Sequence, residues 1–238
     1  MASAFAVLNE TVPAPGWALV ATTALFAAAV SATSFALMTT GRRLLLNRVN
    51  VLGTLFHEGG HALVSILTGG GVFRIEITGA ESGSTRHWNP SPFAGVLATA
   101  AGYAMPPLAG LGAAALLHRG LVPAVLALTA VAMLFILLFT RDVITGLVVV
   151  TVGAVVFCAL RWAPDWVKNG VAYAEAWLLL TSEVGGLGAL VANRVRGFQG
   201  DDASSLAERT GVPGVVWIVA WFVLIGWAVW CAFPMLWP

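Results

Sequence analysis

Charged residues are scarce in this sequence: they make up 10% of its 238 residues, whereas an average soluble domain has about 25%. A soluble protein with so few charges could not cover its surface with polar groups. The apolar excess, 59% of the chain, must therefore face lipid. Runs of basic residues are also missing and the net charge is only +1, which argues against nucleic-acid binding. These absences predict an integral membrane protein in contact with the lipid bilayer.

Cysteine is nearly absent as well. The two cysteines, Cys158 and Cys231, both lie inside apolar runs, where cysteine behaves as a small buried hydrophobic residue. A disulfide framework is therefore not expected. The first ten residues contain Glu10 and no basic side chain, so they do not resemble the start of a cleaved signal peptide.

Long apolar runs, separated by short connections, occupy most of the chain. Lipid offers no hydrogen-bond partners to the backbone, so runs that cross a bilayer must be helical. We predict an all-α polytopic membrane protein with about six to eight transmembrane helices, forming one integral membrane domain over residues 1–238. The predicted spans are 17–38, 49–68, 92–117, 121–139, 143–160, 171–191 and 213–233.

The second predicted span contains the sequence His57-Glu58-Gly59-Gly60-His61. Two histidines four residues apart lie on one face of a helix, so their ring nitrogens can converge on one metal ion. Glu58 lies at the edge of the same face, where its carboxylate can take a proton from a water molecule on that metal. The simpler alternative is two histidines bonded to neighbouring helices, with Glu58 paired to an arginine. Three ionisable groups within five residues of a membrane helix are costly, which favours a Zn²⁺ site with Glu58 as general base.

Gly59 and Gly60 have two interpretations. Each glycine costs about 1 kcal/mol in a helix relative to alanine, so a pair needs a reason. The pair clears space beside the predicted metal, where a substrate backbone could bind. Alternatively, the glycines allow tight packing against another helix. Both interpretations stay open at this point.

A short alternating segment follows the metal-binding helix. Polar and apolar residues alternate through 72–78, turn residues follow at 79–84, and 85–88 can return as a second strand, which predicts a small β-hairpin. It is either a simple connection between two helices or a substrate-binding element. In the second case an extended substrate segment adds to an exposed strand edge, and Ile75 and Ile77 are the candidate substrate-binding residues.

The motif HEGGHAL inside an apolar span resembles the M50 metallopeptidases, the site-2-protease clan of intramembrane zinc proteases. More narrowly, it is similar to the bacterial M50B-like branch. Three further segments carry this resemblance: Thr68–Gly71, the small-residue and proline stretch Ala101–Pro107, and Asp201–Pro213. The resemblance covers 48–217, a metallopeptidase-like core. It implies a protease of regulated intramembrane proteolysis in a bacterial cell membrane, acting on membrane protein substrates.

The third metal ligand is less clear from the sequence. Catalytic zinc sites take three protein ligands. Site-2 proteases supply an aspartate from a Leu-Asp-Gly setting, which this chain lacks. The M50B-like comparison instead points to Asp202. Asp201 or Asp202 could also simply cap a short helix at 203–210. Glu175 and Glu183, within the sixth span, are rival carboxylates because acids at membrane depth are functional candidates.

The predicted function is an intramembrane zinc endopeptidase with His57, His61 and Asp202 as ligands. Two other classes compete with it. One is a zinc-binding membrane scaffold or regulator without protease activity, against which the intact Glu58 argues. The other is a proton-coupled small-solute transporter that relays protons through Glu175 and Glu183. The transporter should be indifferent to His57.

Overall fold

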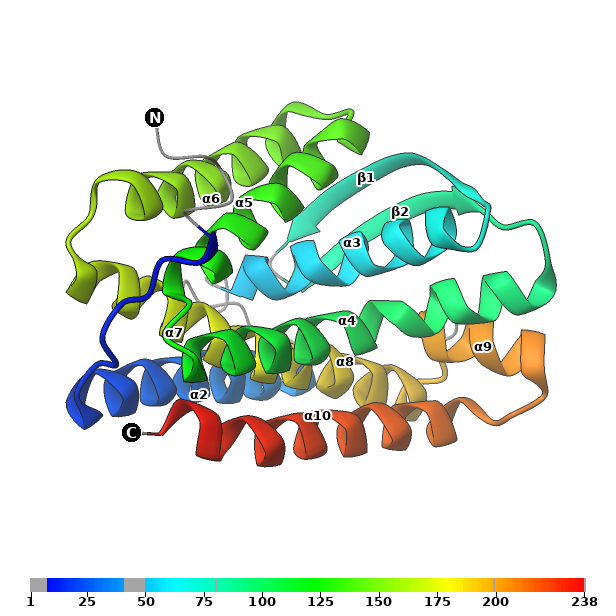
Figure 1. Cartoon of the computed structure of the whole chain (residues 1–238). Helices are drawn as coiled ribbons and strands as arrows, with labels where there is room; N and C mark the ends of the chain where they lie inside the picture. The colour runs from blue at the N-terminus through cyan, green and yellow to red at the C-terminus, as the bar shows by residue number, and fades with distance from the viewer. Residues whose placement is uncertain (1–7, 41–49, 80, 199, 238) are drawn as a thin grey trace.

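The computed structural model describes residues 8–40, 50–79, 81–198 and 200–237. They form a helical bundle with one small β-hairpin, which confirms the predicted fold class (Figure 1). The elements are α2 (Trp17–Thr40), α3 (Val51–Leu67), β1 (Gly71–Gly79), β2 (Ser82–Trp88), α4 (Pro92–His118), α5 (Val122–Phe139), α6 (Val143–Trp162), α7 (Asp165–Thr181), α8 (Glu183–Val195), α9 (Asp202–Thr210) and α10 (Gly214–Leu236).

Within the described residues, six candidate spans are long and apolar enough to cross a membrane: α2, α4, α5, α6, the joined α7–α8 and α10. Their outer faces carry large apolar side chains, among them Val143 at 78% and Trp230 at 80% exposure, as lipid-facing helices require. The helix α3 is shorter, at 17 residues. Its predicted start at residue 49 lies outside the described residues. The sixth predicted span is divided at Ser182 into α7 and α8.

The hairpin lies along α3 (Figure 1) and is tied to the bundle by its first strand. Ile75 and Ile77 of β1 are buried in one apolar cluster with Leu55 of α3 and Ile136 of α5. The backbone N–H of Ile77 also donates to the Thr145 hydroxyl at 2.8 Å. β1 is therefore the strand that packs into the protein core. β2 pairs antiparallel with β1 and lies farther from α5 and α6.

The helix α3 packs closely along α4, and Gly60 makes this possible. A Cβ atom at Gly60 would lie 2.7 Å from the Cβ of Met105 and 2.9 Å from the carbonyl oxygen of Ala101. Gly59 has more room, with the nearest atom of Ile136 at 3.4 Å. The structure thus gives Gly60 a packing role at the α3–α4 contact.

The short helix α9 is held at one end of the bundle by a separate apolar cluster. Leu206 of α9 is fully buried among side chains of three other helices, including Tyr103 of α4, Leu187 of α8 and Trp221 of α10. Figure 1 shows α9 beside the first turns of α4. This packing brings the start of α9 beneath the histidines of α3.

Candidate metal centre

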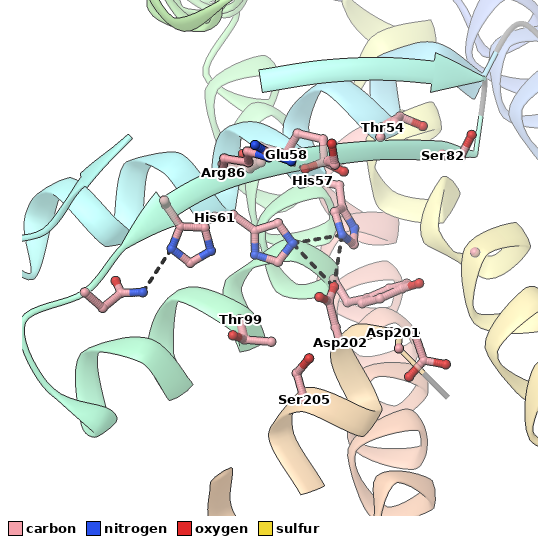
Figure 2. Close-up of a pocket in the computed structure, with 18 of the residues that line it drawn as sticks. Thr54, His57, Glu58, His61, Ser82, Arg86, Thr99, Asp201, Asp202 and Ser205 are labelled. Atoms are coloured by element: carbon pink, nitrogen blue, oxygen red, sulfur yellow. Dashed lines mark hydrogen bonds and ion pairs between the residues drawn. The ribbon is translucent and has the colours of Figure 1, made fainter. Parts of the chain in front are cut away.

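The two histidines of α3 point the same way, as their spacing predicts. The Nε2 atoms of His57 and His61 lie 3.1 Å apart, and His61 is buried at 6% exposure. Figure 2 shows both rings turned toward the start of α9. A single helix turn therefore supplies two nitrogen atoms to one point.

Asp202, the first residue of α9, completes a triangle with these nitrogens. Its Oδ2 lies 3.2 Å from Nε2 of His57 and 3.4 Å from Nε2 of His61 (Figure 2). Ligand atoms that bind one tetrahedral ion at about 2.0–2.1 Å stand roughly 3.3 Å apart. The three atoms already have that spacing, so the described residues include a group that could hold one metal ion.

Gly102 of α4 leaves the space that such an ion needs. A Cβ atom at this position would lie 2.5 Å from Nε2 of His61 and 2.6 Å from Nε2 of His57. Any side chain here would collide with both ligand nitrogens. The absence of a side chain at Gly102 is therefore a second, independent sign that the residues fit a metal.

The neighbouring Asp201 has a different task. Its Oδ1 accepts a hydrogen bond from the backbone N–H of Ser204 at 2.9 Å, which makes Asp201 the N-cap of α9. The same oxygen lies 2.6 Å from Nη2 of Arg194, near the end of α8. Asp201 thus fixes the start of α9 and leaves the Asp202 carboxylate free to face the histidines.

Electrostatics favour an ionised Asp202. Burial alone would raise the pKa of this carboxyl, but His61 and His57 beside it hold its pKa well below the usual range. An ionised carboxylate is the form that binds metal.

Each histidine also makes a contact through Nδ1, the ring nitrogen that faces away from the candidate metal position. Nδ1 of His61 lies 2.7 Å from the carbonyl oxygen of Ala98 on α4. Nδ1 of His57 lies 3.2 Å from Oε2 of Glu183, the first residue of α8. Tyr103 packs edge-on against the His57 ring, with ring centroids 4.5 Å apart. The Nδ1 contacts leave the two Nε2 atoms for the metal side.

Glu58 faces the hairpin. The Thr85 hydroxyl donates to Oε2 of Glu58 at 2.7 Å and lies 3.0 Å from the Glu58 carbonyl oxygen. A Cβ atom at Gly83 would stand 2.7 Å from Oε1 of the same carboxylate. The inner face of β2 therefore covers Glu58 and holds its side chain in place.

A cavity of about 1150 Å³ opens over these groups. Its lining combines the metal-binding triad and Glu58 with residues of β2, of the first half of α4 and of α9. His87 of β2 also lines it, with its ring parallel to that of His61 at 6.1 Å and its Nδ1 accepting from Asn89 at 2.9 Å. Burial, together with His61 and Arg209, lowers the pKa of His87 and favours its neutral form.

Several residues predicted from the sequence lie elsewhere. Gly59, Gly60, Ile75 and Ile77, the predicted substrate-binding residues, do not line the cavity. The side chains of both isoleucines point into the core, because β1 is the inner strand of the hairpin. The outer edge of β1 is also occupied, because Ile75 forms a bridge with Thr140 and the backbone N–H of Ile77 donates to Thr145. Any strand edge offered to a substrate therefore belongs to β2.

The rival carboxylates separate clearly. Glu175 accepts a hydrogen bond from the Thr129 hydroxyl of α5 and does not belong to the metal-binding group. Glu183 touches His57 but not the point where the three ligand atoms meet. Sequence reasoning missed Thr85, Gly102 and this contact of Glu183. The glycine lay in a small-residue stretch, whereas no local pattern marks the other two.

A family model described as Peptidase M50B-like matches residues 19–232, nearly the whole chain. No curated protein and no solved structure matches the chain significantly. Taken with the six apolar spans and the triad, the match shows that this integral, multi-pass membrane protein belongs to the Peptidase M50B-like family.

Proposed function

We propose that the protein is an intramembrane zinc endopeptidase that cleaves peptide bonds in or near transmembrane segments of other membrane proteins. The observation that carries the proposal is the convergence of His57, His61 and Asp202 from two distant helices on one point. Glu58 stands beside that point in the same cavity. A purely structural metal would need no neighbouring base.

The residues of the cavity have distinct roles in this proposal. His57, His61 and Asp202 would hold the zinc ion, which when bound polarises a peptide carbonyl and makes water more acidic. Glu58 accepts the proton of the attacking water and passes it to the leaving amine. The Thr85 hydroxyl keeps the Glu58 carboxylate in one position through its 2.7 Å hydrogen bond.

The substrate must be unwound before it is cut, because a helix keeps its carbonyl groups in internal hydrogen bonds. The hairpin supports a way to hold the unwound segment. β2 pairs only with β1 in its two-stranded sheet, and its residues line the cavity beside Glu58. We infer that an extended substrate segment adds to the free edge of β2. A bacterial cell membrane as the location remains part of this proposal.

Metal content tests the first half of the proposal. Purified wild-type protein should contain one zinc ion per chain by elemental analysis, and His57→Ala and Asp202→Ala should lose it. Zinc lost with His57→Ala but kept with Asp202→Ala would remove Asp202 from the ligands. Wild-type protein without zinc after supplementation would overturn the proposal.

Catalysis is tested with Glu58→Gln, which keeps the shape of the side chain but not its basicity. Membranes from cells that express wild type should show new peptide N-termini within or beside transmembrane segments when profiled by mass spectrometry. Glu58→Gln should retain zinc and lose these termini. A zinc-binding scaffold predicts no difference between the two proteins. A transporter predicts solute uptake that depends on Glu175 and Glu183 and ignores His57→Ala.

A further inference from the structure

Glu183 lies where the chain passes from α7 into α8 and is buried at 6% exposure. It comes 126 residues after His57 in the chain, yet its Oε2 stands 3.2 Å from Nδ1 of the His57 ring. A buried carboxyl group needs a partner to offset the loss of hydration. The contact to His57 provides this partner and connects α8 to the metal centre.

The direction of the contact is informative. An imidazole ring that binds metal through Nε2 carries its remaining proton on Nδ1, and that N–H needs an acceptor. Nε2 of His57 faces Asp202 and His61, so Nδ1 is the nitrogen left for Glu183. The acceptor fixes both the tautomer and the orientation of the ring.

The two histidines are held by different kinds of acceptor. His61 has the carbonyl oxygen of Ala98, which belongs to the backbone of α4 and is fixed with the helix. His57 has a side-chain carboxylate, which is a stronger acceptor than a neutral carbonyl. A carboxylate behind a ligand histidine also makes the ring more basic and a better ligand.

Gly186 of α8 leaves room for the Glu183 carboxylate beside Tyr103. Gly186 follows Glu183 by three residues along α8. A Cβ atom at Gly186 would lie 3.4 Å from Oε2 of Glu183 and 3.2 Å from the Tyr103 ring. Tyr103 in turn packs against the His57 ring. The glycine thus leaves room for the Glu183 carboxylate and the Tyr103 ring, each of which contacts His57.

We propose that Glu183 is a positioning residue for the metal centre: its carboxylate accepts the Nδ1–H of His57 and holds the ring so that Nε2 points at the metal. The proposal rests on the proposed metal site. It assigns Glu183 neither as a ligand nor as a general base. It also predicts that Glu183 controls metal affinity from outside the coordination shell.

The test compares zinc affinity in wild type, Glu183→Gln and Glu183→Leu, measured by competition with a chelator. Glutamine keeps an acceptor oxygen but loses the charge, whereas leucine loses both. Replacement of such an outer partner lowers metal affinity about 10–100-fold. We expect a loss in that range for leucine and a smaller loss for glutamine. The matched control is Glu175→Gln, a buried glutamate of the same span that should leave zinc affinity unchanged.

A second readout separates positioning from a structural role. Protein loaded with Co²⁺ should show altered visible absorption bands in the Glu183 variants, because the orientation of one ligand ring changes. If Glu183→Leu fails to fold, Glu183→Gln carries the test alone. Unchanged zinc affinity and an unchanged Co²⁺ spectrum in folded Glu183 variants would overturn this inference. The metal site itself fails differently, since wild type would then bind no zinc and His57→Ala would change nothing.

Discussion

Two buried glutamates on the α7–α8 span have nearly equal exposure and opposite surroundings. Glu175 is 5% exposed and Glu183 is 6% exposed. Glu183 contacts a histidine of the candidate metal centre, whereas the hydrogen bond of Glu175 within the described part of the chain comes from the Thr129 hydroxyl. Glu175 borders a separate cavity of about 260 Å³ that is lined mainly by apolar side chains. One of these two acids thus contacts a histidine of the candidate site, and the other joins α7 to α5.

The same contrast holds for two glycines of α4. A Cβ atom at Gly102 would press against the ligand nitrogens of both histidines. At Gly112, almost three helix turns further on, an added Cβ atom would meet nothing within 4 Å. The two histidine rings therefore pack directly against Gly102 and leave no space for a side chain there. Gly112 is exposed, so its surroundings tolerate an additional methyl group.

The largest effect is expected from Gly102→Ala. The new methyl group would lie about where the two Nε2 atoms must approach a metal, and the rings cannot retreat easily because Ala98 and Glu183 hold them. Zinc affinity should fall by at least roughly 100-fold. Gly112→Ala, the matched control, should bind zinc like wild type. Elemental analysis after dialysis measures both, and stoichiometric zinc in Gly102→Ala would contradict the described geometry.

The next largest effect is expected from a change that moves Glu58, the proposed general base, and leaves the proposed zinc ligands in place. Gly83→Ala would push the Glu58 carboxylate away from its position, since the new Cβ would lie 2.7 Å from Oε1. We expect turnover to fall about 10-fold or more while zinc content stays at one per chain. Thr85→Val, which removes the hydroxyl that Glu58 accepts from, should have a smaller effect in the same direction. The measurement compares the production of new N-termini by these variants with that by wild type. Full activity in Gly83→Ala would contradict the proposed role of Glu58 as general base.

A third test uses pH and the tip of the hairpin. Burial raises the pKa of Glu81 from an ordinary 4.5 to about 7, even though Asn50 donates a hydrogen bond to it at 2.6 Å. The folded protein therefore binds this proton more tightly than the unfolded chain. Stability contributed by the protonated group is full below pH 4.5 and is lost as pH rises to about 7. The loss amounts to at most about 3 kcal/mol at 1.36 kcal/mol per pKa unit.

Thermal unfolding of detergent-purified protein at several pH values measures this loss. Glu81→Gln should flatten the dependence between pH 4.5 and 7, because the amide cannot titrate. An equally steep decline in the variant would assign the effect to other groups. The metal-binding histidines also add a pH dependence, so wild type and Glu81→Gln are compared at equal zinc, where that contribution is common to both proteins.

The smallest effect is expected at the apolar end. Glu175→Gln and Thr129→Val should each destabilise the fold by about 0.5–1 kcal/mol, the usual size of a hydrogen bond between membrane helices. A double-mutant cycle should show that the two losses are coupled, as their direct contact requires. Zinc affinity and proteolysis should not change. A loss of activity in Glu175→Gln would break the contrast with Glu183 and revive a proton-relay role.

The sequence predicted much of this site because part of the site is local. His57, Glu58 and His61 lie within five residues, so the helix period alone places them together. The hairpin was also predictable from its alternating pattern and turn residues. Which face of each strand packs against the protein was not predictable. Ile75 and Ile77 were predicted to bind substrate, but their side chains face the core. Alternation reveals two faces but does not say which face the rest of the protein covers.

The sequence by itself determined the membrane setting, the helical spans and the face of α3 that carries both histidines, because hydropathy and helix geometry act over short stretches of chain. Only the tertiary structure places Asp202, rather than Glu175, beside both histidines. Its carboxylate comes 145 residues after His57, and it meets the histidines because Leu206 buries α9 against the bundle while Asp201 caps its first turn. The roles of Glu183 and Gly102 follow in the same way from helix packing, which distributes contacts across the whole chain.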